Sequence, residues 1–313
     1  MKSAFIFPGQ GSQSIGMLEA AAGHWPIIEG TFSEASEVLG YDLWQLCQKG
    51  PEEELNSTTV TQPALLTASI ALWRQWFMAG GRQPDLLAGH SLGEYSALVA
   101  AESLDFSDAI KLVQLRGELM QTAVPAGEGR MAAILGLDDD EVVAACDEAA
   151  GNDVVSAVNF NAPGQVVIAG HTAAVERAMQ ACKGRGARKA MPLPVSVPSH
   201  CALMKGAAGE LASALEGVSF NNAVMPVVQN VTASPEQDRE KLKANLVKQL
   251  YSPVLWTDCV RTLVNQGVSV TVECGSGRVL AGLVKRIDRN LPVFGIETPE
   301  SLQAALDAVN EGK

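Results

Sequence analysis

The pentapeptide Gly89-His90-Ser91-Leu92-Gly93 is the part of the sequence that most directly suggests chemistry. It matches G-x-S-x-G, a motif that places an exposed serine hydroxyl on a sharp turn between a strand and a helix. The apolar run 86–88 before it predicts a buried strand, and residues 92–101 after it predict a helix. Glycines on both sides of the turn lack β-carbons, so strand and helix can approach closely. We therefore predict that Ser91 is a nucleophile, although a serine in an ordinary glycine-bounded turn fits the same pattern.

A serine hydroxyl is a weak nucleophile until a base removes its proton. The histidines of the chain are His24, His90, His171 and His200. His90 is the neighbour of Ser91, but side chains of neighbours across a sharp turn point in different directions. His200 follows the proline-rich segment 192–198, which stiffens the chain, whereas the other two lie in helical, surface-like contexts. We predict His200 as the base. No acidic residue stands out as a third member, so a backbone carbonyl could orient the imidazole instead.

An arginine stands on the apolar face of a predicted helix over residues 107–122, for which Ser107 is the expected N-cap. Arg116 is three or four residues from each of Leu112, Val113, Leu119 and Met120. A guanidinium in that position needs an anionic partner, because an unpaired buried charge is costly. Either Arg116 forms a structural salt bridge or reaches solvent, or it awaits a substrate carboxylate, which its planar fork can bind with two hydrogen bonds.

Composition and charge exclude several classes of function. The formal net charge of −12 disfavours nucleic acid and anionic membranes as partners. No apolar stretch is long enough to span a bilayer, and the N-terminus shows no signal-peptide pattern, so we expect a cytoplasmic protein. Six cysteines and four histidines lack the spacing of zinc sites. The sequence therefore predicts no metal site.

The chain has 313 residues, more than one hydrophobic core usually serves, so two subdomains are expected. After a linker at 125–129 the pattern changes to strand, helix, two strands, helix and strand. These elements are expected at 130–137, 138–150, 154–161, 165–169, 171–183 and 188–195. The order βαββαβ is that of a ferredoxin-like module. We predict an α/β fold with a large catalytic subdomain from 1–125 and 198–313, and an inserted ferredoxin-like small subdomain at 126–197.

The large subdomain is expected to alternate strands and helices. Strands are predicted at 3–7, 86–88, 224–231 and 268–273, and helices at 17–39 (broken near Pro26), 51–55, 62–79, 203–215, 240–250, 256–266 and 279–287. Glycine-rich loops follow two of the strands, at 8–13 and 275–277. Both lack the third glycine of a dinucleotide-binding fingerprint, because Ser14 and Leu280 occupy its place, so we reject nucleotide binding.

Several motifs, taken together, identify a family. They are Phe7-Pro8-Gly9-Gln10-Gly11-Ser12-Gln13, Gln62-Pro63-Ala64, Gly89-His90-Ser91-Leu92-Gly93-Glu94, Arg116-Gly117 with Met120, Asn159 with Asn161-Ala162-Pro163-Gly164-Gln165, and Val197-Pro198-Ser199-His200. In type, order and spacing the chain resembles the malonyl-CoA:acyl-carrier-protein transacylases of bacterial type II fatty-acid synthesis over essentially its whole length. One departure is Ser276, where the family often has proline between two glycines.

The resemblance implies a hydrolase-like α/β fold with a ferredoxin-like insert, and a catalytic set without a cofactor. Ser91 would carry the malonyl group as an ester, and His200 would act first as base and then as acid. The backbone N–H groups of Gln10 and Leu92 would form the oxyanion hole. The backbone carbonyl of Gln249 would orient the histidine.

The resemblance also implies the substrates. Arg116 would pair with the free malonyl carboxylate, with Gln62 as a second substrate-binding residue, and the acyl group would pass from malonyl-CoA to acyl carrier protein. An acidic carrier would need a basic docking patch, since this chain is acidic too. The candidates are Arg188, Lys189, Lys285 and Arg286, although an ordinary solvated surface fits them as well. Nothing suggests an obligate assembly, so we expect a monomer.

Three alternatives stay open on the sequence. A serine hydrolase or thioesterase could use the same turn, although the arginine on an apolar face and the missing acid count against it. A non-catalytic binding subunit could carry the turn without using it. Within the family, the acyl group could be another extender unit such as methylmalonyl, and the segment 197–199 does not decide between them.

Overall fold

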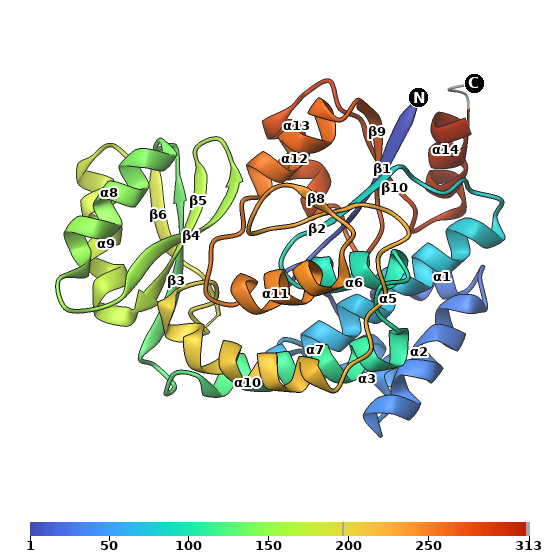
Figure 1. Ribbon diagram of the computed structural model, residues 1–313, viewed down its shortest axis with the longest axis horizontal. Helices are drawn as coiled ribbons and strands as arrows, with labels where there is room; N and C mark the ends of the chain where they lie inside the picture. Colours follow the sequence, from blue (N-terminus) through green and yellow to red (C-terminus); the bar gives the residue numbers. More distant parts are fainter. Residues whose placement is uncertain (196, 311–313) are drawn as a thin grey trace.

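The structure, a computed structural model, describes residues 1–195 and 197–310 and contains two sheets, each with its own helices (Figure 1). The larger sheet has six strands in the order β10-β9-β1-β2-β7-β8. Its strands are β1 (Lys2–Phe7), β2 (Leu86–Gly89), β7 (Val227–Val228), β8 (Pro235–Glu236), β9 (Val268–Glu273) and β10 (Val293–Gly295). All neighbours pair in parallel except β7 and β8, which pair antiparallel. The α/β class predicted from the sequence is confirmed.

Side chains of β1 alternate between the two faces of this sheet, as the pleat of a strand requires. Phe5 and Phe7 pack into one core cluster with α2, α5, α6, α7, α10, α11 and α14. Ala4 and Ile6 pack into a second cluster with α12 and α13. Both faces of the central strand are therefore buried, which explains its continuous apolar run.

The helices of this larger part differ at their ends from the prediction. Their bounds are α1 (Glu19–Ala22), α2 (Ile27–Leu39), α3 (Leu43–Lys49), α4 (Glu52–Leu55), α5 (Thr58–Met78), α6 (Gly93–Ala100), α7 (Phe106–Thr122), α10 (Lys205–Glu216) after a 3₁₀ turn (Ala202–Met204), α11 (Arg239–Gln249), α12 (Trp256–Asn265), α13 (Val279–Ile287) and α14 (Pro299–Asn310). α5 begins at Thr58 and includes Pro63, so the predicted start at 62 is wrong. The N-cap of α7 is Asp105, whose carboxylate accepts from two backbone N–H groups, and not Ser107. The strand predicted at 224–231 shrinks to β7.

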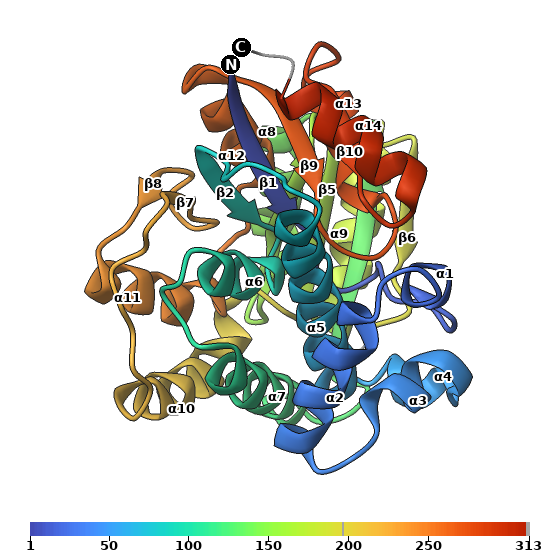
Figure 2. The same ribbon diagram turned by 90° about the vertical axis from the view of Figure 1, so that its right-hand side faces the viewer.

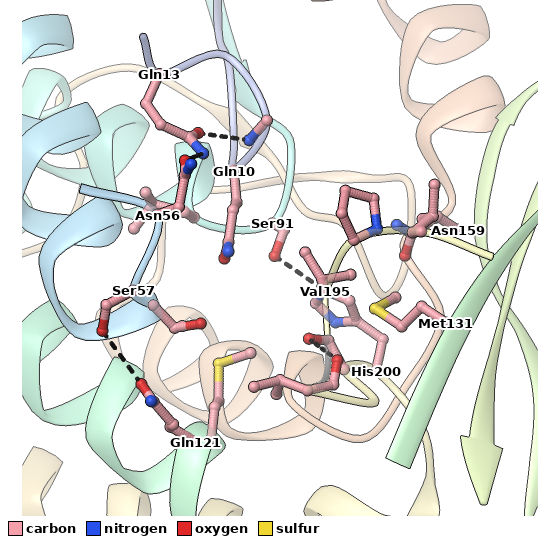
Figure 3. Close-up of a pocket in the computed structure, with 18 of the residues that line it drawn as sticks. Gln10, Gln13, Asn56, Ser57, Ser91, Gln121, Met131, Asn159, Val195 and His200 are labelled. Carbon is pink, nitrogen blue, oxygen red and sulfur yellow. Dashed lines mark hydrogen bonds between the residues drawn. The ribbon is translucent and has the colours of Figure 1, made fainter. Parts of the chain in front are cut away.

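The smaller sheet is antiparallel, in the order β4-β5-β3-β6. Its elements are β3 (Gly129–Leu135), α8 (Asp139–Ala150), β4 (Val155–Ala162), β5 (Gln165–His171), α9 (Thr172–Gly184) and β6 (Lys189–Pro192), so the chain order is βαββαβ. One face packs against α8 and α9 through residues such as Ile134. The other face carries Met131 and turns toward the larger part (Figure 3).

The two sheets are joined beside β4. Val254, just before α12, accepts a backbone hydrogen bond from Phe160 at 3.0 Å and donates one to Val158 at 2.8 Å. Thr257 Oγ1 also donates to the carbonyl of Phe160 at 3.0 Å. In the turned view α5 and α7 run side by side beneath the larger sheet (Figure 2). The domain boundaries at 125/126 and 197/198 stay predictions, and Ser196 and residues 311–313, which fall within the predicted subdomains, lie outside the described residues.

Candidate active site

The G-x-S-x-G turn lies where β2 ends and α6 begins, as predicted. Ser91 has φ 52°, a left-handed conformation that costs a non-glycine residue about 1–2 kcal/mol. A β-carbon at Gly89 would overlap the backbone of Gly93, and one at Gly93 would overlap the carbonyl of Phe7 in β1. The glycines therefore let the strained serine stand between two elements in backbone contact.

His200 meets Ser91 across the fold (Figure 3). Its Nε2 lies 2.8 Å from Ser91 Oγ, and its Nδ1 lies 2.6 Å from the backbone carbonyl of Gln249. A carbonyl can only accept, so Nδ1 carries the proton and Nε2 accepts from the serine hydroxyl. That tautomer is the one a general base needs.

His200 is held in its neutral form. The side chain is buried, and burial together with the nearby Arg116 guanidinium lowers the pKa of His200 to about 3. An imidazole with so low a pKa accepts a proton only when its partner releases one during the reaction. His90 is partly buried and also lines the cavity, and desolvation lowers its pKa, but its Nε2 lies 2.8 Å from Asn161 Oδ1, away from the serine hydroxyl.

Arg116 is 1% exposed and points into the same site. Its guanidinium donates to Gln62 Oε1 at 2.9 Å, to Gln249 Oε1 at 3.0 Å and to Ser91 Oγ at 3.2 Å. All these acceptors are neutral, and within residues 1–195 and 197–310 Arg116 forms no salt bridge. The cation is therefore buried without the carboxylate partner that a structural salt bridge would supply.

Two helices bring Arg116 to this position. α7 passes so close to α5 that a β-carbon at Gly117 would clash with the backbone of Thr58. The contact sets Gln62 of α5 against the guanidinium, with its amide Nε2 near Met120 Sδ at 3.6 Å. Gln62, predicted as a substrate-binding residue, thus orients the arginine through its buried amide.

Two residues that line the cavity have backbone N–H groups without a hydrogen-bond acceptor among the described residues. They are Gln10, in the loop after β1, and Leu92, at the start of α6. Gly9, next to Gln10, lies so close to the turn that a β-carbon there would overlap the carbonyl of His90. Unpaired N–H groups beside a nucleophile are what an oxyanion hole requires.

Ser91 and His200 line a cavity of about 490 Å³ between the two sheets, whereas Gln62 and Gln249 lie outside its lining. Polar side chains around α5 and α7, including Ser57 and Gln121, form one wall, and Met131, Asn159 and Val195 form the opposite wall (Figure 3). Ser91 and His200 point toward one another between the walls. Gln10, Leu92 and Arg116 also line this cavity. Gln249 holds the histidine from behind.

Comparison with known proteins agrees with this geometry. Residues 4–290 match the acyl transferase domain family. The chain belongs to that family. It is 58% identical over 303 residues to the malonyl CoA-acyl carrier protein transacylase of Salmonella typhimurium, covering 97% of this chain and 98% of the relative. The resemblance seen in the sequence is therefore confirmed.

Solved structures of the acyl transferase family superpose closely on the chain. An acyl carrier protein S-malonyltransferase from Vibrio cholerae is 57% identical, with a TM-score of 0.95 over 97% of this chain and 99% of that one. A malonyl-transacylase solved in complex with its type II PKS acyl-carrier protein is 56% identical, with a TM-score of 0.97 over 98% of this chain and 100% of that one. The predicted enzyme class, acyl-carrier-protein S-malonyltransferase, is that of these relatives.

The residues proposed for docking lie outside the cavity and are exposed. Arg188 and Lys189 are at the start of β6, and Lys285 and Arg286 are in the last turn of α13. Gln165, which accepts a hydrogen bond from Arg286 at 3.1 Å, and Lys189 are the two partners of Leu135 across adjacent strands. Both pairs of basic residues therefore lie at the same end of the smaller sheet.

The sequence analysis missed two residues beneath the turn. Asn230 accepts a hydrogen bond from the Ser91 N–H, and Glu94 accepts one from the Asn230 N–H. Both are fully buried. A carboxylate at a buried position of a short apolar helix was the only local signal for Glu94, and burial raises its pKa to about 7.

The described residues contain neither a candidate metal site nor a helix that could span a membrane. They hold no group of three or more His, Cys, Asp or Glu side chains that could bind a metal. Within the same residues, no helix is long and apolar enough to cross a membrane.

Proposed function

We propose that this enzyme transfers the malonyl group of malonyl-CoA to the phosphopantetheine thiol of an acyl carrier protein, through an ester on Ser91. The observation that supports this best is the convergence of Ser91, His200 and Arg116 on one cavity. A nucleophile, a neutral base and an unpaired cation together fit an acyl group that ends in a carboxylate. The names of the relatives specify the same donor and acceptor.

The first half-reaction forms the ester. Ser91 Oγ adds to the thioester carbonyl of malonyl-CoA while His200 Nε2 takes its proton. The oxygen of the tetrahedral intermediate binds to the N–H groups of Gln10 and Leu92, each worth roughly 3 kcal/mol in the transition state. The C–S bond then breaks, His200 returns the proton to sulfur, and CoA leaves as a thiol.

The second half-reaction runs the same steps in reverse order. The phosphopantetheine thiol of the carrier gives its proton to His200 and attacks the ester carbonyl. The C–O bond to Ser91 breaks, and the proton returns to Ser91 Oγ. Because the acyl group remains on Ser91 after CoA has left, donor and acceptor bind in turn, which is ping-pong kinetics.

Arg116 supplies selectivity in this scheme. Its two hydrogen bonds to Gln62 and Gln249 leave the guanidinium beside Ser91 Oγ, where the malonyl carboxylate would lie. An acetyl group would leave the buried cation without an anion, and a site with unpaired buried polar groups discriminates strongly. Malonyl is therefore favoured over acetyl.

The carrier would dock on the basic end of the smaller sheet, at Arg188, Lys189, Lys285 and Arg286. One relative was solved with its acyl-carrier protein bound, which supports a carrier as the partner. The malonyl carrier so formed would supply fatty-acid chain elongation. We further propose that the enzyme is cytoplasmic and acts as a monomer.

The test is retention of label. Protein incubated with radiolabelled malonyl-CoA and then denatured should keep the label in the native chain and lose it in Ser91→Ala. The matched control is Ser96→Ala in α6, the helix that follows the turn, which should keep the label, since Ser96 is buried outside the cavity. A labelled Ser91→Ala protein would remove Ser91 from the role. Rapid loss of the native label to water, without a thiol acceptor, would indicate a hydrolase instead.

A further inference from the structure

Asn230, two residues beyond β7, touches the nucleophile's turn with both ends of its side-chain amide. Its Oδ1 accepts from the Ser91 N–H at 2.7 Å, and its Nδ2 donates to the Gly89 carbonyl at 2.6 Å. The side chain is fully buried and lies outside the cavity, so it does not meet substrate. One amide therefore bridges the backbone on either side of His90.

The bridge fixes the first of two peptide planes that determine the geometry of the nucleophile. A peptide is planar and trans, so holding the Ser91 N–H fixes the plane between His90 and Ser91. The next plane, between Ser91 and Leu92, is held by its carbonyl, which accepts from Gln249 Nε2 and from the Glu94 N–H, both at 3.0 Å. The same peptide plane contains the Leu92 N–H, which points in the opposite direction from that carbonyl. Anchoring the two planes thus directs both the Ser91 hydroxyl and the Leu92 donor.

Asn230 is itself held at both of its backbone groups. Its N–H donates to Glu94 Oε2 at 2.8 Å, and its carbonyl accepts from the Leu255 N–H at 3.0 Å. Glu94 lies in the first turn of α6, the helix that begins two residues after Ser91. The hydrogen bonds therefore form a closed ring from the turn to Asn230, to Glu94 and back to the helix that follows the turn.

We propose that Asn230 is a positioning residue for catalysis: its amide holds Ser91 in the left-handed conformation that aims the hydroxyl at His200 and the Leu92 N–H at the developing oxyanion. The proposal rests on Ser91 being the nucleophile. Ser91 with φ 52° needs such external support, because the strain would otherwise relax.

The chemistry of the bridge is specific to asparagine. The Ser91 N–H requires an acceptor and the Gly89 carbonyl requires a donor, and an amide supplies one of each at fixed separation. Aspartate would offer two acceptors, one of them 2.6 Å from the Gly89 oxygen. Only when protonated could that carboxyl donate as the amide does.

The first experiment is single-turnover acylation of Ser91 by malonyl-CoA, followed by mass spectrometry across donor concentrations. In Asn230→Ala the rate at saturation should fall about 100-fold, the loss expected when a reacting group moves by about 1 Å. The donor concentration giving half the maximal rate should change less than about threefold, since Arg116 and the cavity are intact. The matched control is Asn245→Ala, a buried asparagine of α11 that bonds Gln229 Oε1 at 3.3 Å and should acylate at the native rate.

The second experiment separates positioning from folding. The acylation rate of Asn230→Asp, divided by the native rate at each pH, should be highest at low pH and fall as the new carboxyl ionises. Asn245→Asp should give a flat ratio. The titratable and charged groups around the bridge, which native and variant share, are His90, Glu94, Arg116, His200 and Cys259.

Each outcome decides the proposal. A folded Asn230→Ala protein that acylates within threefold of the native rate overturns it, as does a flat ratio for Asn230→Asp. If Asn230→Ala does not fold, the pH profile decides alone, and loss of fold in both variants overturns it too, because the residue then serves folding. A native protein that takes no malonyl on Ser91 refutes the proposed function instead, so the two failures are distinguishable.

Discussion

The cavity has one side formed by the larger part of the protein and one formed by the smaller part, and the side chains on the two sides differ. The larger part carries Ser91, His200 and Arg116, whose side chains are hydrogen-bonded to one another and to the backbone carbonyl of Gln249. The smaller part carries the apolar side chains of Met131 and Val195, with Asn159 as the polar residue beside them. The difference indicates that the larger part supplies the chemistry and the smaller part supplies shape. Substitutions on the two walls should therefore differ in size and in the kinetic constant they change.

The largest effect should come from replacing His200 in the larger part. His200→Ala should lower the rate of Ser91 acylation about 1,000-fold, the contribution typical of a general base. His90→Ala, the matched control, should lower it less than about tenfold, because His90 bonds Asn161 and not the serine. Equal losses in the two variants would contradict the assignment.

The pH dependence of the native acylation rate tests the same histidine. Since the pKa of His200 is lowered to about 3, the base is already deprotonated above that pH. His200 should therefore give the rate no inflection near the ordinary histidine value of about 6.5. The carboxyl of Glu94, whose pKa burial raises to about 7, is a separate group that titrates in this range. A single inflection there, absent from His90→Ala, would assign the titration to His90 and leave His200 unaffected.

The next effect concerns Arg116. Arg116→Ala should lower kcat/KM for malonyl-CoA at least about 100-fold, because truncating one partner of a buried charge pair costs 2–5 kcal/mol or more. Acetyl-CoA should become a better substrate than it is for the native enzyme, since no cation is left unpaired. Competition between the two donors measures both values. An equal fall for both would refute the role in selectivity.

On the apolar wall the effect should be smaller. Met131→Ala removes buried apolar surface worth roughly 1 kcal/mol and should raise KM for malonyl-CoA about threefold to tenfold, with kcat unchanged. Met179→Ala is the matched control, because Met179 of α9 is buried in the cluster that packs against the opposite face of the same sheet. A fall in kcat for Met131→Ala would give this wall a chemical role and end the contrast.

The smallest effect should be at the docking surface. Reversing charge in Lys285→Glu with Arg286→Glu should raise KM for acyl carrier protein severalfold, more at low salt, and leave KM for malonyl-CoA unchanged. Lys205→Glu, an exposed change at the start of α10, is the control. An unchanged KM for the carrier would exclude this surface.

How far the sequence predicts the site depends on the range of its interactions. Ser91 was found because G-x-S-x-G is a local pattern with local mechanics, and Arg116 because a cation on an apolar helix face conflicts with its surroundings. His200 was found by elimination among few histidines. Asn230 could not be found in this way, because its partners lie 139 and 141 positions away. A bond from a side chain to a distant backbone group leaves no periodicity in the sequence.

The fold shows the same limit at element ends. The first strand and the βαββαβ order follow from runs of apolar residues and their periodicity, and both were predicted. The start of α5 was misplaced because proline usually stands in the first turn of a helix, whereas Pro63 lies further inside. The strand at 224–231 was predicted too long, because its length is set by partners on β2 and β8 rather than by its own apolar residues.

The backbone hydrogen bonds at Val254 limit how a substrate thiol can reach Ser91. They fasten the smaller sheet to the larger part on β4, the strand that carries Asn159 of the cavity lining. A folded carrier domain cannot pass between two pieces fastened in this way. Under the proposed function, the thiol would arrive at the end of a thin, flexible stem, and phosphopantetheine is such a stem on both CoA and the carrier. Narrow access between the two parts of the protein would thus explain why two otherwise unrelated thiols can react at the same serine.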